Sequence, residues 1–260
     1  IENNNKLILI DTGMGNKQSD KFFSYYAQWG DDNLIKSLRA KGFHLDDITD
    51  VFLTHLHFDH CGGAVSWNSS RTGYELTFKN ANYWTNEAHW KWATKPNARE
   101  KASFLVENLK PIEDSGQLKF LNVTSEGLCN LDALGFDAYV VNGHTEKQML
   151  PIISYQNKTL CFAADLIPTC GHIPLPYVMG YDTRPLITLK EKQEFLELAI
   201  KNNYYLFFPL FPLPTSSLFY NYRIQRNTKD EINDEQYVPE NIKKTFTTSI
   251  IDTNIYINYV

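Results

Sequence analysis

Residues 54–63 hold an unusual density of side chains that could bind a metal ion. His55, His57, Asp59 and His60 place three imidazoles and one carboxylate within six positions. So many polar groups do not fit a packed core unless something binds them. A single histidine here could be an ordinary surface residue. Incidental spacing is a poor explanation for the whole cluster. Histidine nitrogen and carboxylate oxygen suit zinc, the metal we expect, and also suit manganese, iron or cobalt.

A short buried strand is predicted to deliver this cluster. Residues 51–54 form an apolar, β-prone run directly before the histidines, and Gly62 and Gly63 let the backbone turn sharply after them. The candidate ligands are therefore expected where a strand ends. Two other predicted strands, residues 6–11 and 136–141, also end in glycine-containing turns with polar side chains, namely Asp11-Thr12-Gly13 and Asn142-Gly143-His144-Thr145.

Asp165 follows a predicted β-hairpin formed by residues 151–155 and 159–164. A carboxylate after such an apolar strand would be unfavourable if it were buried without a partner, so we expect a cation or a hydrogen-bond network around it. Asp11 emerges at the end of its own strand in the same way. For Asp11, an Asx turn that caps the strand is the alternative.

These motifs together resemble those of the metallo-β-lactamase-fold hydrolases. The cluster fills an H-x-H-x-D-H pattern, and further motifs match in order along residues 6–208. Four ordered motifs are much more specific than any one of them. Residues 165–168 and the long spacing from Asp59 to His144 look like the branch that holds N-acyl-homoserine lactonases and methyl-parathion-hydrolase-like enzymes. The further motifs are Asp11-Thr12-Gly13, Asn142-Gly143-His144-Thr145 and Ala163-Ala164-Asp165.

The resemblance implies an α/β (α+β) fold, a four-layer αβ/βα sandwich in which two mixed sheets lie face to face with helices outside. We expect one domain over residues 1–208, and a divergent segment over residues 209–260 that packs on this domain or is partly irregular. The chain begins at Ile1 instead of methionine, and family members carry a further strand at this point. We therefore expect a missing N-terminal strand.

The resemblance also implies two zinc ions in the cleft at the strand ends. Some residues would orient the metal ligands without binding metal themselves, and these are Asp11 and Thr145. The implied ligand sets are His55, His57 and His144 for the first ion, Asp59 and His60 for the second, and Asp165 as a bridge between the two.

For the reaction, the resemblance implies a metal-bound hydroxide as the nucleophile, because two divalent ions lower the pKa of a shared water toward about 7. Asp59 would hold the hydroxide and pass its proton to the leaving alkoxide, which makes it the expected catalytic residue. We expect a metallo-hydrolase that opens an ester or lactone, with an N-acyl-homoserine lactone as the leading substrate. Phosphotriester (organophosphate) hydrolysis is the alternative, because the fold hosts both reactions.

The family pattern breaks after the last predicted strand, residues 204–208. Family members carry one more histidine ligand there, whereas this chain has Leu210 and no histidine beyond His172. Since leucine cannot bind a metal, the second site would keep only Asp59, His60 and Asp165, unless His172 substitutes. Three explanations stay open: divergence with a weakened second site, a C-terminal segment from an altered reading of the gene, and a degenerate non-catalytic metal-binding scaffold.

Aromatic residues near these motifs could form the wall of a substrate pocket. Phe22, Phe23 and Tyr26 recur at helical spacing after the Asp11 loop, which is typical of a core stripe and also fits a flap over an apolar substrate. The proline-rich loop 168–185 would add His172 and Tyr181.

For two other candidate metal ligands, a structural role is the favoured interpretation. His89 lies on a predicted aromatic helix over residues 87–93, outside the motifs, and Cys61 lies beside His60, where a thiolate ligand is the less favoured reading. A further helix is predicted over residues 98–109, with Pro111 marking its end.

Composition narrows the class of partner. The chain has 260 residues, a formal net charge of −5 and no basic tract, so we expect a small-molecule substrate and no nucleic acid. No apolar run approaches a membrane span, so we expect no membrane partner. Four scattered cysteines without C-x-x-C spacing argue against a disulfide framework. We expect a cytoplasmic protein, with the periplasm, secretion and a homodimer left open.

Overall fold

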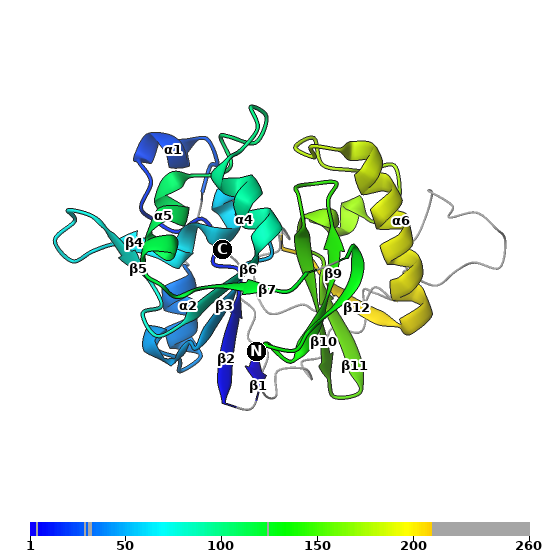
Figure 1. Cartoon of the computed structure of the whole chain (residues 1–260), viewed down its shortest axis with the longest axis horizontal. Helices are drawn as coiled ribbons and strands as arrows, with labels where there is room; N and C mark the ends of the chain where they lie inside the picture. Colours follow the sequence, from blue (N-terminus) through cyan, green and yellow to red (C-terminus); the bar gives the residue numbers. More distant parts are fainter. Residues whose placement is uncertain (4, 29, 31–32, 124, 210–260) are drawn as a thin grey trace.

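Two five-stranded sheets face each other, and helices cover their outer faces (Figure 1). The computed structural model describes residues 1–3, 5–28, 30, 33–123 and 125–209. This arrangement confirms the predicted four-layer αβ/βα sandwich of the α/β class. The proposed division at residue 208 stays a prediction, because residues 210–260 lie outside the described part of the chain.

The first sheet has the strand order β1-β2-β3-β6-β7, in which β2, β3, β6 and β7 are parallel and β1 is antiparallel to β2. Parallel neighbours bring their carboxyl ends to one edge, where open α/β sheets usually bind ligands. The loops after β2 and β3, which carry Asp11 and the histidine cluster, therefore meet. The bounds are β1 Glu2–Asn3, β2 Lys6–Ile10, β3 Asp50–Phe52, β6 Asn82–Asn86 and β7 Leu118–Leu121.

The second sheet has the order β12-β11-β10-β9-β8 and is antiparallel except for the pair β11 and β12. His144 follows β9 and Asp165 follows β11. Its strands are β8 Gly127–Leu131, β9 Phe136–Val141, β10 Gln148–Tyr155, β11 Lys158–Phe162 and β12 Tyr204–Phe207. A separate hairpin joins β4 Val65–Trp67 to β5 Tyr74–Leu76. Neither β8 nor this hairpin was predicted.

Three apolar cores separate the four layers. On β9, Ala138 and Val140 face the core between the sheets, whereas Tyr139 and Val141 face the core beneath α6. On β3, Phe52 packs between the sheets and Val51 packs beneath the helices of the first half. Successive side chains of a strand point to opposite faces of its sheet. Because the other sheet covers one face and helices cover the other, both sets of side chains are apolar and the strands appear in the sequence as continuous apolar runs.

Of the two helices predicted by range, the one over residues 87–93 is confirmed as α4, Glu87–Thr94. The helix predicted over residues 98–109 is wrong, because α5 begins at Val106 and continues through Pro111 to Asp114. Proline removes one backbone hydrogen bond, but Leu109 and Ile112 on either side are buried in the core and hold the helix together. The helices are α1 Asp20–Ser24, α2 Leu34–Ala40, α3 Phe58–Cys61, α4 Glu87–Thr94, α5 Val106–Asp114 and α6 Pro185–Asn202.

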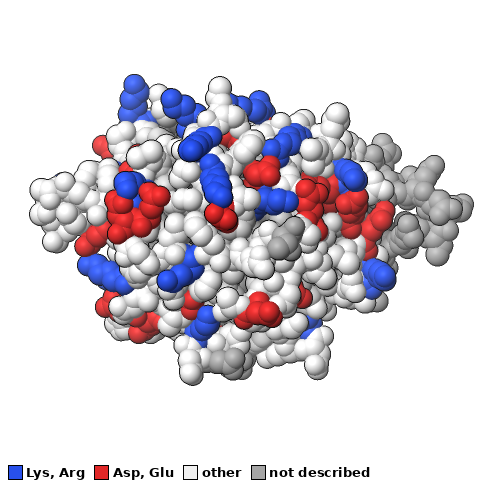
Figure 2. Space-filling view, in the orientation of Figure 1, with Lys and Arg blue, Asp and Glu red and all other residues white. Residues whose placement is uncertain are grey.

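Acidic and basic side chains are interspersed on the face shown in Figure 2. The absence of a nucleic-acid partner stays a prediction, because nothing in the structure tests it. Within the described part of the chain, no helix combines the length and the apolar character needed to cross a bilayer.

Candidate metal centre

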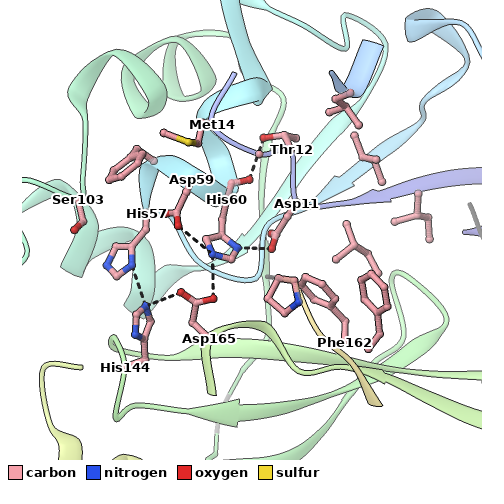
Figure 3. Close-up of a pocket in the computed structure, with 18 of the residues that line it drawn as sticks. Asp11, Thr12, Met14, His57, Asp59, His60, Ser103, His144, Phe162 and Asp165 are labelled. Atoms are coloured by element: carbon pink, nitrogen blue, oxygen red, sulfur yellow. Dashed lines mark hydrogen bonds and ion pairs between the residues drawn. The ribbon is translucent and has the colours of Figure 1, made fainter. Parts of the chain in front are cut away.

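Three histidines from separate parts of the chain converge on one buried point. One ring nitrogen each from His55, His57 and His144 lies within 4.8 Å of the others. Nδ1 of His57 lies 3.1 Å from Nε2 of His144 (Figure 3). The loop after β3 supplies the first two residues and the turn after β9 supplies the third, so the two sheets together form this group.

Hydrogen-bond partners determine which nitrogen of each ring carries the proton. Nδ1 of His144 faces the acceptor Oδ1 of Asp182 at 3.0 Å, and Nδ1 of His55 lies 3.1 Å from the Thr54 hydroxyl. That hydroxyl donates its own hydrogen to Asp11 at 2.8 Å, so it accepts from His55. Nε2 of His57 faces Oε1 of Glu100 at 3.5 Å. The other nitrogen of each ring points at the common point, where it binds a metal once it carries no proton.

The cluster fits a metal ion on this geometry. The facing nitrogens of His57 and His144 lie 3.1 Å apart, so one proton can lie between them or, once both are unprotonated, one metal ion can bind both. Nε2 of His55 is buried and has no hydrogen-bond partner among the described residues. Ligands at about 2.0–2.1 Å from a tetrahedral zinc ion lie about 3.3 Å apart. The observed spacing is therefore close to that of a zinc site.

A second group adjoins the first through Asp165. Oδ1 of Asp165 lies 3.2 Å from Nε2 of His60, and Oδ2 lies 3.3 Å from Nε2 of His144. One carboxylate thus faces both groups, as the predicted bridging role requires. Oδ2 of Asp59 lies 3.8 Å from Nε2 of His60, at the more exposed side of the cluster. The tighter second group is formed by His55, His60 and Asp165, without Asp59.

The charges around the cluster shift several pKa values. Burial alone would lower the pKa of His60, but Asp165, Asp59 and Asp11 together raise it well above its ordinary value. Burial would raise the pKa of Asp165, yet His60 and His144 hold it well below the usual range. Burial lowers the pKa of His55, which stays neutral and able to bind metal. When no metal is bound, protons on the histidines therefore balance the negative charge of the carboxylates.

Asp11 orients the ring of His60 through a hydrogen bond to Nδ1, the ring nitrogen that does not face the second group. Its carboxylate accepts hydrogen bonds from Nδ1 of His60 and from the backbone and hydroxyl of Thr54, all at 2.8 Å. This leaves Nε2 of His60 for the second group. The capping alternative for Asp11 is therefore incomplete, because the side chain orients a candidate ligand. Its φ of 53° lies in the left-handed region that aspartate tolerates better than most residues.

The chain turns at Gly62 and Gly63 as predicted, but close packing, more than backbone conformation, requires glycine at Gly62. Gly62 has φ −59° and ψ −40°, which any residue can adopt. A Cβ there would lie 2.1 Å from the carbonyl oxygen of Met14, and one on Gly63 would lie 2.2 Å from that of Thr12. The two glycines thus let the loop after β2 lie directly against the histidine-bearing turn.

Two carboxylates that the sequence did not single out orient the histidines. Asp182 in the loop before α6 is buried and bonds His144, as described above. Glu100 accepts hydrogen bonds from Thr145 at 2.6 Å and Trp92 at 2.7 Å, and faces His57. Thr145 therefore acts on the cluster through Glu100. Neither carboxylate belongs to a motif, so the sequence shows only that each residue is acidic and gives no sign that it contacts a histidine.

Three other residues considered as ligands belong to neither group of candidate ligands in the described chain. The ring of His89 accepts from the Leu56 amide at 2.8 Å and donates to the Glu146 carbonyl, so it ties two site loops together as a structural residue. The Cys61 thiol donates to the Leu56 carbonyl at 3.2 Å, and burial raises its pKa to about 12. His172 faces Thr169 and belongs to neither group of candidate ligands in the described chain.

A cavity of about 850 Å³ opens onto the cluster. His57, Asp59, His60, His144 and Asp165 line it, so the candidate ligands are accessible to a small molecule. Among the predicted pocket residues, some line this cavity and some do not. Tyr26 and Tyr181 line it, whereas Phe22, Phe23 and His172 do not, although the ring centroid of Phe22 lies 5.1 Å from that of Phe58. Phe58 and Met179, which were not predicted, also line the cavity.

Glu100→Gln should destabilise the metal-free protein in a pH-dependent way. Burial would raise the pKa of Glu100, but hydrogen bonds from His57, Thr145, Trp92 and Asn97 lower it from 4.5 to about 2. A lowered carboxylate pKa stabilises the fold above pH 4.5, and this contribution is lost as the pH falls toward 2. The shift corresponds to about 3 kcal/mol at pH 7.

Urea unfolding of wild-type and variant protein between pH 7 and pH 3 measures this difference. We expect the gap in unfolding free energy to narrow steadily below pH 4.5. Glu87→Gln, at an exposed glutamate on α4, is the matched control and should change little. A gap that stays constant with pH would show that the Glu100 charge does not matter.

The sandwich and its buried histidine and aspartate cluster define a metal-binding protein. The chain belongs to the metallo-beta-lactamase superfamily, because the family model of that description matches residues 1–209. Members of this superfamily bind divalent metals. A comparison with curated protein sequences finds no match.

Solved structures resemble this chain over most of its length. A protein described as a probable metal-dependent hydrolase from Staphylococcus aureus has a TM-score of 0.67 and 25% identity, covering 77% of this chain and 69% of its own. AidC, described as a dizinc quorum-quenching lactonase, has a TM-score of 0.63 and 27% identity, covering 82% and 71%. An N-acyl homoserine lactone hydrolase at 19% identity and TM-score 0.59, covering 80% and 77%, supports the fold alone.

Proposed function

We propose that this protein is a metal-dependent hydrolase of carboxylic esters or lactones, with an N-acyl-homoserine lactone as the first candidate substrate. The observation that carries the proposal is the convergence of three histidine nitrogens and one carboxylate at the wall of an accessible cavity. The similarity to AidC, a lactonase, supports the choice of substrate. A divalent ion bound here supplies Lewis-acid chemistry, which activates water and polarises a carbonyl group.

The chain's own residues then divide the work. His55, His57 and His144 would hold the first ion, and Asp165 would face both ions. Asp59 lines the cavity and its side chain is 36% exposed, so its carboxylate can accept a proton from the attacking water and return it to the leaving oxygen.

The cavity also offers a surface for the rest of the substrate. Phe58 and Met179 provide apolar area next to the cluster, and Tyr26 and Tyr181 place phenol groups along the same wall. An acyl chain would pack on the apolar side chains, while the phenol hydroxyls can orient a carbonyl or amide group.

We propose zinc as the metal, with the first site occupied more tightly than the second. The first group has three histidine nitrogens and a carboxylate oxygen, a full tetrahedral set. The second has His60 and Asp165 and shares His55 with the first, with Asp59 at its margin, and His172 does not complete it. We therefore expect the two ions to differ in affinity.

Metal content and substrate preference test the proposal together. Purified protein should bind zinc and hydrolyse an N-acyl-homoserine lactone or a simple aryl ester faster than an aryl phosphotriester, with zinc or manganese supplied. A chelator should remove the activity, and zinc should restore it. Preference for the phosphotriester would replace the lactone assignment with the organophosphatase alternative.

The missing histidine favours one further candidate, a non-catalytic metal-binding protein. One equivalent of tightly bound zinc without turnover on any of these substrates would support it. Two equivalents with turnover would exclude it.

A further inference from the structure

Lys192 on α6 carries a buried positive charge directed at the loop before that helix. The residue is fully buried. Its Nζ donates to three backbone oxygens, those of His172 at 3.0 Å, Pro174 at 2.9 Å and Tyr177 at 2.7 Å. These bonds use all three ammonium protons. No carboxylate of the described chain forms an ion pair with this group.

Burying an ammonium group is unfavourable, and a residue of similar shape such as methionine would fill the same space without that penalty. Burial lowers the pKa of Lys192 to about 8, although Asp182 acts in the opposite direction. The group is therefore charged at pH 7, and the loop carbonyls are arranged around that charge.

The loop held in this way leads directly to the metal centre. Within residues 172–182 it carries Tyr181, on the cavity wall, and Asp182, which bonds His144. Nη2 of Arg99 donates to the carbonyls of Gly180 at 2.9 Å and Asp182 at 3.0 Å, so the far end of the loop is anchored separately. Lys192 anchors the near end.

Asp182 depends on this support. Its Oδ1 bonds His144, while its Oδ2 is buried and has no hydrogen-bond partner in the described chain. A single hydrogen bond does not by itself fix the orientation of this carboxylate, which therefore also depends on the backbone that carries it and on nearby charge. Lys192 contributes to both: it fixes three carbonyls earlier in the same loop, while Arg99 fixes the carbonyl of Asp182 itself, and its ammonium charge attracts the Asp182 carboxylate.

We propose that Lys192 is a positioning residue for the metal centre, which acts through residues 172–182 and Asp182 to hold the ring of His144 in its metal-binding orientation. The inference rests on the proposed function in so far as the cluster binds zinc. A purely structural lysine would contribute to stability and leave zinc affinity unchanged.

A double-mutant cycle on zinc affinity tests the proposal. The variants are K192M, D182N and K192M/D182N, and affinity is measured by competition with a coloured chelator. K192M should weaken zinc binding about tenfold and D182N by about ten- to a hundredfold, the range for partners behind metal ligands. The double variant should be no more than about twofold weaker than D182N, because coupled residues are not additive.

K190M is the matched control, since Lys190 lies on the same helix with its side chain 76% exposed. It should bind zinc like wild type. Hydrogen exchange within residues 172–182 should be faster in K192M than in K190M. If K192M does not fold, K192Q replaces it in the same cycle, because glutamine keeps two donors and no charge.

Two results would overturn the proposal. One is an unchanged zinc affinity in a folded K192M or K192Q, and the other is losses that multiply in the double variant, which would show that Lys192 does not act through Asp182. Wild-type protein that fails to bind zinc at all would instead refute the proposed function, so the two failures are distinguishable.

Discussion

Asp165→Asn should remove hydrolytic activity, with a loss of at least about a thousandfold, because bound ions contribute several kcal/mol to such reactions. Asp165 faces both groups, with Oδ1 at 3.2 Å from Nε2 of His60 and Oδ2 at 3.3 Å from Nε2 of His144. The amide keeps the shape and removes the negative charge that draws two cations together. Zinc per protein after dialysis and kcat/KM on the best ester or lactone measure the effect.

Asp132→Asn is the matched control, because Asp132 is an exposed aspartate in the turn between β8 and β9. The control should keep both zinc content and activity. A fully active Asp165→Asn variant would mean that the two groups do not act as one centre. Loss of activity with full zinc content would shift the role of Asp165 from holding metal to the reaction itself.

Asp59→Asn should lower kcat by a factor of between about 10² and 10⁴, the range for a positioned general acid or base. The substitution removes the carboxylate that lines the cavity and would carry the proton between water and the leaving oxygen. Asp59 is not a member of the first group, which consists of three histidines. At least one zinc ion should therefore remain bound, and KM should change much less than kcat.

Steady-state kinetics combined with metal analysis measure this prediction. A substrate with a more acidic leaving group should suffer less, because it needs less help from a proton donor. Asp20→Asn, at an exposed aspartate in α1, serves as the control. Unchanged kcat would remove Asp59 from the reaction, and loss of all zinc would make it a ligand of the tighter site.

The elements that deliver the candidate ligands could be predicted from the sequence because their signals are local. The apolar runs before Asp11, His55 and His144 became strands, and their polar residues lie at the strand ends, as expected. The errors arose where tertiary packing overrides local preference. Pro111 lies inside α5 because buried neighbours on both sides stabilise that helix.

The residues that orient the histidines could not be predicted in the same way. Glu100 lies 43 positions from His57 and Asp182 lies 38 positions from His144 in the sequence. Each occurs in a loop without periodicity or motif, so only the folded chain shows that it faces a ring nitrogen. The same holds for Lys192, which reads as an ordinary charge on an amphipathic helix until its burial is known.

The sequence by itself determined the kinds of ligand, their order along the chain and the strand ends that carry them, since spacing and apolar runs are properties of short segments. Only the tertiary structure decided which nitrogen of each histidine is free to bind metal and that His172 stays apart from the candidate ligands. These outcomes depend on partners that packing brings together from distant segments, because a ring's proton follows the nearest acceptor and not its neighbours in sequence.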